Sequence, residues 1–247
     1  TFCYRVYGRR LTRRTPEDVA AEVEELVCRY RVDVIGFRDD LFMNNRPWLY
    51  EICDRLEKLT PRVAWSCLGR VDLVDREILR RMKSAGCFWI SYGVESGSPL
   101  ILQEMRKRQS SEEAVAALRL TAGAGIHADA SFLIGMPSET PETVAETVHL
   151  CRDADITATF NFVTPYPGSE LYEWARRRGM VGDEEEYVSC LGTATDLVMN
   201  LTAMPDSTLV ALKLKAERAI AMAYLQRHPV RGTVAALRRL VENMGLA

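Results

Sequence analysis

Two periods of hydrophobic residues alternate along most of the chain and predict helices and strands in turn. The first helix begins where Thr15 can cap, Pro16 takes the first position and Glu17 faces the positive end of the helix dipole. A short apolar run at 32–37 then predicts a buried strand. Further strands are predicted at 63–68, 87–94, 126–135 and 156–163, and further helices begin near residues 46, 75, 98, 111 and 140. The pattern is therefore a repeating helix–strand unit of about 30 residues.

This alternation predicts parallel strands joined by right-handed crossovers, which both a doubly wound sheet and a βα barrel satisfy. Polar residues gather just after the predicted strands, and this feature favours the barrel. In a barrel all strand ends converge on one mouth, whereas in an open sheet only those near a switch point meet. The residues concerned are Asp39 and Asp40, Ser66 and Arg70, Glu95 and Ser96, Ser138 and Glu139, and Thr164 and Tyr166.

The repeat stops after a helix that ends near Gly179. We therefore divide the chain into a βα unit at 1–182 and a helical extension at 183–247, with no clear period at 187–204. From Pro205 onward seven Lys or Arg side chains outnumber three acidic ones. We expect this basic segment to dock on the acidic remainder, with a basic face offered to a partner as the alternative.

Composition narrows the class of protein. The 247 residues are 47% hydrophobic and 27% charged, as in globular domains, and a net charge of −2 argues against nucleic-acid binding. The uncharged stretch 156–169 contains two prolines and is too short to span a membrane. Seven irregularly spaced cysteines indicate a reducing, cytoplasmic compartment. Cys28, Cys53 and Cys151 are predicted to face inward from helices.

Six segments of the chain occur in a characteristic order: Phe2-Cys3, Phe37 to Phe42, Trp65 to Arg70, Tyr92 to Ser98, Gly125 to Glu139 and Thr164 to Gly168. Their order and spacing resemble those of the radical S-adenosylmethionine (SAM) superfamily. The resemblance covers residues 1 to about 180, and the basic helical end is similar to that of cobalamin-binding members.

The resemblance implies a 4Fe-4S cluster with Cys3 as a ligand, and SAM bound to the iron that has no protein ligand. It places Phe2 against the adenine, one of Asp39 and Asp40 at the amino group, and Glu95 at the ribose or amino group. Arg70 is expected to face a carboxylate, because guanidinium binds that group in a planar fork. The other implied cofactor-binding positions are Ser66, Ser96, Gly135, Thr164 and Tyr166.

Several of these residues have a structural alternative. Asp39 and Asp40 could cap the next helix, since Asp is favoured there. Phe160, Phe162 and Tyr166 fit the core as well as they fit contact with a substrate.

The fold implied is a partial parallel βα barrel that lacks its first strand, followed by the helical extension. The function implied is radical SAM chemistry, with cobalamin-dependent methyl transfer as the narrower expectation, the cobalamin being held by a domain missing from this sequence. The expected partners are a small-molecule or peptide substrate and an electron donor such as a flavodoxin or ferredoxin. Two alternatives stay open: a conventional βα-barrel enzyme using Asp40, Glu95 and Arg70 in acid–base or metal chemistry, and a non-catalytic binding module.

The sequence departs from the family pattern at one point. The signature CxxxCxxC is represented by its last cysteine, Cys3, without the first two cysteines or the first strand. A single thiolate cannot retain a cluster, so the chain as given is expected to be inactive. We also expect the strand at 32–37 to present an uncovered edge, so that this piece expressed alone associates with itself.

Overall fold

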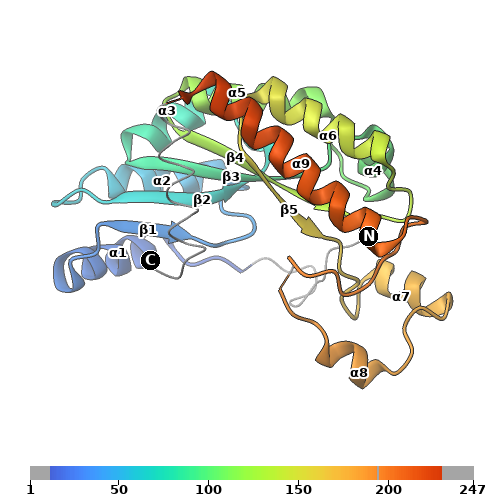
Figure 1. Ribbon diagram of the computed structural model, residues 1–247. Helices are drawn as coiled ribbons and strands as arrows, with labels where there is room; N and C mark the ends of the chain where they lie inside the picture. Colours follow the sequence, from blue (N-terminus) through green and yellow to red (C-terminus); the bar gives the residue numbers. More distant parts are fainter. Residues whose placement is uncertain (1–11, 194, 230–247) are drawn as a thin grey trace.

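The computed structural model describes residues 12–193 and 195–229. Five parallel strands form one sheet in the order β1-β2-β3-β4-β5. Because the spatial order follows the chain order, every right-handed crossover steps in the same direction and places its helix on the same face. A doubly wound sheet reverses direction part-way, so the partial barrel is confirmed over the described residues (Figure 1). The strands are β1 (Val34–Phe37), β2 (Ala64–Gly69), β3 (Cys87–Glu95), β4 (His127–Ile134) and β5 (Ala158–Phe162).

The covering helices begin where the local sequence predicts. Thr15 and Thr140 accept hydrogen bonds from backbone amides of their first turns, and Asp75 does the same. Asn45 caps the second helix by accepting from the amide of Trp48, so the capping alternative for Asp39 and Asp40 is wrong. The elements of this layer are α1 (Pro16–Tyr30), α2 (Arg46–Leu56), α3 (Arg76–Ser84), α5 (Ser111–Gly123) and α6 (Pro141–Ala154), with the short α4 (Pro99–Glu104) and the 3-10 turn η1 (Val71–Leu73) between them.

The main core lies between the sheet and these helices. Alternate strand residues are buried on the helix side, among them Trp65, Tyr92, Phe132 and Phe160. Phe160 and Phe162 are therefore core residues. The other set of strand residues faces the concave side of the sheet, which we call the inward face, and its partly buried polar and charged members include Ser66, Ser91, Glu95, Asp129 and Ser131.

The cysteines follow the prediction with one exception. Cys53 and Cys151 are buried on helices, but Cys28 is exposed. The apolar face of α1 runs through Ala20, Val23 and Val27, and Cys28 lies about 100° around the helix from Val27. The expectation that Cys28 faces inward is wrong for that reason.

A second apolar cluster lies beyond the carboxyl ends of the strands, where α7 (Glu170–Arg177) and α8 (Glu184–Ser189) extend away from the sheet (Figure 1). α8 lies within the predicted helical extension at 183–247, although no separate helix was predicted there; Asp183 caps it by accepting from the amide of Glu186, and Tyr187 is its buried residue. The cluster comprises Ile101, Met105, Met136, Val163, Leu171, Tyr172, Ala175, Val181, Tyr187 and Leu201.

The long helix α9 (Asp206–Arg227) docks on α6 and β5, which confirms the expected docking for this part of the basic segment. Leu209, Ala216 and Ile220 enter the main core. At the end of the helix, His228 Nε2 lies 2.7 Å from Asp155 Oδ2. Residues 230–247 of the segment lie outside the described residues.

Candidate functional site

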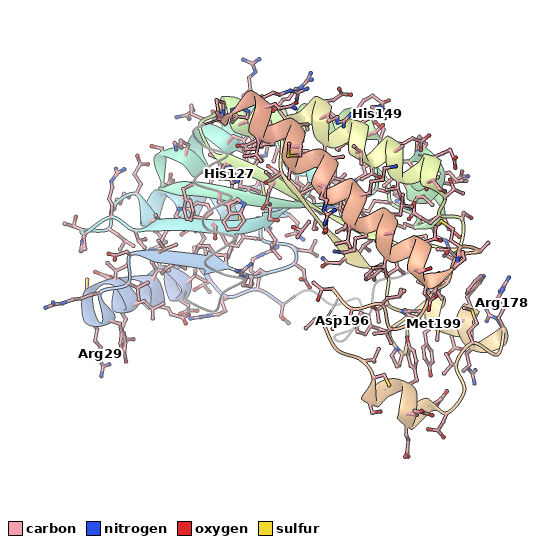
Figure 2. All side chains as sticks on the ribbon, viewed as in Figure 1. Arg29, His127, His149, Arg178, Asp196 and Met199 are labelled. Atoms are coloured by element: carbon pink, nitrogen blue, oxygen red, sulfur yellow. The ribbon has the colours of Figure 1, made fainter. Side chains whose placement is uncertain are left out.

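The carboxyl ends of the five strands lie at one end of the sheet, on the side of α7 and α8 (Figure 1). In barrels this end holds the chemistry. His127 is the first residue of β4, at the opposite end of that strand, and His149 lies on α6 in the outer helical layer (Figure 2). His127 and His149 are thus both away from the carboxyl ends of the strands.

Glu95 ends β3 in an unusual backbone conformation. Its φ is +71°, and the register between β3 and β4 shifts between Gly93 and Glu95. A bulge with positive φ redirects the side chain, and here the carboxylate folds back over Gly93. A Cβ on Gly93 would lie 2.7 Å from Glu95 Oε1. The absent side chain at position 93 therefore provides the space that the carboxylate occupies.

Lys107 fixes this carboxylate from outside the sheet. Its Nζ donates to Glu95 Oε1 at 2.9 Å, and both side chains are largely buried, 25% and 13% exposed. Lys107 belongs to the segment between α4 and α5, and this segment is fastened to β3 by a bond from Gln109 Nε2 to the carbonyl of Val94 (2.8 Å). The segment therefore delivers a cation to the end of β3.

Arg70 is already engaged by a neighbour. Its Nε and guanidinium nitrogen donate to the two oxygens of Asp72 at 3.0 and 2.9 Å. These bonds hold the pKa of Asp72 below its usual value, and the charge of Lys107 adds to the effect. Arg70, Asp72, Lys107 and Glu95 thus form a chain of alternating charges across the ends of β2 and β3.

Ser96 points away from the inward face. It is buried, its hydroxyl lies 3.3 Å from that of Thr147 on α6, and the amide of Gly97 donates to the same threonine oxygen at 2.9 Å. A Cβ on Gly97 would lie 2.6 Å from the Cα of Thr147. This turn brings β3 and α6 into close contact, and a cofactor role for Ser96 stays a prediction.

Gly135 follows β4 with φ +110°, a conformation that glycine adopts freely. Its amide donates to Glu139 Oε2 at 3.2 Å, and the hydroxyl of Thr143 donates to the other oxygen of that carboxylate. Burial raises the pKa of Glu139 to about 7, against these hydrogen bonds, which lower it. The buried carboxyl group thus holds the loop in its glycine-dependent conformation.

Thr164 and Tyr166 follow β5 beside the Gly135 loop, since the amide of Val163 donates to the carbonyl of Ile134 at 2.9 Å. Thr164 is buried and Tyr166 is partly buried. Tyr187 of α8 donates to the carbonyl of Pro165 at 2.8 Å, which ties this loop to the second apolar cluster.

The other predicted positions are spread more widely. Asp39 and Asp40 are exposed after β1, and Ser66 lies within β2 on the inward face. Phe2 and Cys3 lie outside the described residues. The structure therefore brings Arg70 and Glu95 into one group and Gly135, Thr164 and Tyr166 into another, both at the carboxyl ends.

The cysteines of the described part are free thiols. Cys53, Cys67, Cys87 and Cys151 are buried, and burial raises the pKa of Cys53 to about 12, so this thiol is protonated. Within residues 12–193 and 195–229 no group of three or more His, Cys, Asp or Glu side chains could hold a metal ion. Cys3, the ligand that the resemblance implies, lies outside the described residues, and its role stays a prediction. None of the described helices has the length and apolar character needed to cross a membrane.

Residues 1–151 match the sequence model of the Radical SAM superfamily. The chain belongs to the radical SAM superfamily. An uncharacterised methyltransferase of Pyrococcus horikoshii is 33% identical over 170 residues, 68% of this chain and 37% of that protein. The anaerobic magnesium-protoporphyrin IX monomethyl ester cyclase of Rubrivivax gelatinosus is 31% identical over 177 residues, 70% of this chain and 32% of that protein.

The fold agrees with this membership. The radical SAM methyltransferase TsrM of Kitasatospora setae, solved with cobalamin and a [4Fe-4S] cluster bound, superposes with a TM-score of 0.60 at 23% identity, over 68% of this chain and 35% of that one. The chain spans about a third of the length of the curated relatives it matches. The relatives named above are a methyltransferase and a cyclase, and membership in this superfamily favours an enzyme over a non-catalytic module.

Sequence reasoning assigned no role to three residues that contact the candidate site residues Glu95 and Arg70: Gly93, Lys107 and Asp72. Gly93 stands two residues before Glu95, a spacing that places it beneath the same side of the strand. Lys107 stands in the basic run 106–108 between two helices, where a solvated surface is the ordinary interpretation. No feature of the sequence identifies Lys107, because its position opposite Glu95 is set by the fold.

Proposed function

We propose that the full-length protein binds SAM across the carboxyl ends of β2 to β5 and cleaves it reductively with a 4Fe-4S cluster. The observation that carries the proposal is the Glu95 carboxylate, fixed over Gly93 on the inward face with one oxygen bonded to Lys107. A carboxylate held in this way is a preorganised acceptor for the ribose hydroxyls or the amino group of SAM.

A 4Fe-4S cluster, held in part by Cys3, would supply the one electron that reductive cleavage of SAM requires. The residues of this chain bind and orient the cofactor. Gly135 allows close approach of backbone after β4, Thr164 and Tyr166 border it after β5, and Cys3 with Phe2 completes the site. The exposed carboxylates of Asp39 and Asp40 are available for the amino group.

The finer proposal is methyl transfer to a small molecule, assisted by cobalamin held outside this sequence. This proposal is supported by the similarity of the chain to methyltransferases, among them the P. horikoshii methyltransferase and TsrM. The inward face offers polar groups for a substrate. Asp129 Oδ1 is buried there without a hydrogen-bond partner among the described residues, and the register places Asp129 beside Ser91. A buried acceptor of this kind favours a substrate that carries N–H or O–H groups.

The test is iron and SAM binding by the full-length protein purified and reconstituted without oxygen. About four irons per site are expected, and Cys3→Ala should lose them together with SAM binding, because three thiolates hold such a cluster. Cys28→Ala, at an exposed cysteine of α1, is the matched control and should keep both. Iron retained by Cys3→Ala, or wild-type protein that takes up no iron, would contradict the proposal.

A further inference from the structure

Lys107 is a largely buried cation to which the proposed function gives no task. Its Nζ lies 2.9 Å from Glu95 Oε1 and 3.5 Å from the place that a Cβ on Gly93 would occupy. Lysine is rarely buried unless it is paired. The partner it has is the carboxylate to which the cofactor contact is assigned.

The pair leaves one carboxylate oxygen open. Lys107 donates to Oε1, and no donor to Oε2 occurs among residues 12–193 and 195–229. An ionised carboxylate accepts through both oxygens, so Oε2 retains its full capacity to accept from a ligand. The bond to Oε1 therefore fixes the direction in which Oε2 of Glu95 can accept a hydrogen bond.

The segment that carries Lys107 has other attachments to the fold. Gln109 bonds to Val94, Arg106 bonds to Glu170, and Ser110 with Glu113 forms a capping box at the start of α5. These contacts hold the segment without the ammonium group. For a largely buried ion pair the attraction is offset by the desolvation of both charges, so the pair by itself is weak grounds for assigning Lys107 a role in stability.

We propose that Lys107 is a positioning residue for SAM binding, holding Glu95 in the orientation in which Oε2 accepts from the cofactor. The inference rests on the proposed function. Without Lys107 the Glu95 side chain can adopt several rotamers. SAM binding then has to restrict it to one of them, and this loss of conformational entropy lowers the affinity for SAM. Arg70 does not take the place of Lys107: it donates through Nε and one terminal nitrogen to Asp72, and no bond from Arg70 to Glu95 occurs among the described residues.

The experiment measures SAM affinity by calorimetry on the full-length, cluster-loaded protein. Lys107→Met should weaken binding about five- to tenfold, while Lys107→Arg, which keeps a cationic donor, should stay within about twofold of wild type. Lys58→Met replaces an exposed lysine and should leave affinity unchanged. In a Glu95→Gln background, Lys107→Met should cause no further loss, because Lys107 acts through that carboxylate.

Undiminished affinity in Lys107→Met, or a loss that adds fully to that of Glu95→Gln, overturns the proposal. Thermal unfolding of each variant separates loss of fold from loss of positioning, and Lys107→Gln replaces the methionine variant in the same comparison if that variant does not fold. Wild-type protein that carries its cluster but binds no SAM contradicts the proposed function instead.

Discussion

Gly93 shows how an absent side chain determines where a functional one can lie. The Glu95 carboxylate occupies the space over its Cα, and the ammonium group of Lys107 borders the same space. Glycine in a strand interior commonly marks a bulge or a close approach, and both are present here.

Gly93→Ala should therefore displace the carboxylate while leaving the strand intact. The added methyl group would lie 2.7 Å from Glu95 Oε1, so the side chain has to move. We expect SAM affinity to fall by about tenfold, or ~1.4 kcal/mol, measured by calorimetry. Gly123→Ala is the control, because a Cβ at that helical glycine meets nothing within 4 Å. Equal affinity in both variants would show that Glu95 adapts without loss.

Glu139 predicts a pH dependence of stability. Burial raises its pKa in the folded protein to about 7, from a usual value of 4.5. The folded state then binds more protons than the unfolded state between these values, so the free energy of unfolding falls as pH rises through this window. The slope is about 1.4 kcal/mol per pH unit.

Urea unfolding at pH 5 and pH 7.5 tests this. Wild type should lose on the order of 2 kcal/mol relative to Glu139→Gln over that range, because the amide does not titrate. Glu24→Gln, at an exposed position on α1, should show the wild-type pH dependence. A constant difference between wild type and Glu139→Gln across the range would contradict the raised pKa.

Elements were predictable where their signals are local. Three helix caps can be recognised from a few neighbouring residues, and each begins a helix in the structure: Thr15-Pro16, Asp75 and Thr140-Pro141. The six-residue α8 has one buried residue, Tyr187, and its burial depends on a distant carbonyl. A helix this short carries no hydrophobic period of its own, so the cap at Asp183 is the one local signal for it in the sequence.

The docking of α9 rests on a few buried side chains, and two leucines of the same helix test it. Leu209 is 0% exposed and approaches Gly135, whereas Leu214 is 47% exposed. Leu209→Ala should lower the free energy of unfolding by about 2–5 kcal/mol, the usual effect of a cavity in a core. Leu214→Ala should change it by less than about 0.5 kcal/mol. Similar losses in urea unfolding would mean that α9 is not docked as described.

At the scale of the whole molecule, the parallel arrangement of the strands was predictable, but the alternating charges of Arg70, Asp72, Lys107 and Glu95 were not. Polar residues after successive strands indicated that the strand ends meet, and the sequential sheet order confirms it. The pairing of Lys107 with Glu95 depends on how the segment between two helices folds back over β3. Such contacts form across elements and leave no period or cap in the sequence.

The two outer strands differ in how far they can accept a neighbour. Glu217 of α9 accepts a hydrogen bond from the backbone amide of Phe160 at 3.3 Å and also from Lys213. The amide of Phe160, on the outer edge of β5, is therefore already bonded to a charged side chain. At β1, Val34 is 53% exposed, and α9 packs against β5 at the opposite edge of the sheet. Inward-pointing charges at an edge oppose strand addition, and exposed apolar edges invite it. Growth of the sheet is thus directional: a sixth strand, whichever segment or chain supplies it, is expected to join at β1.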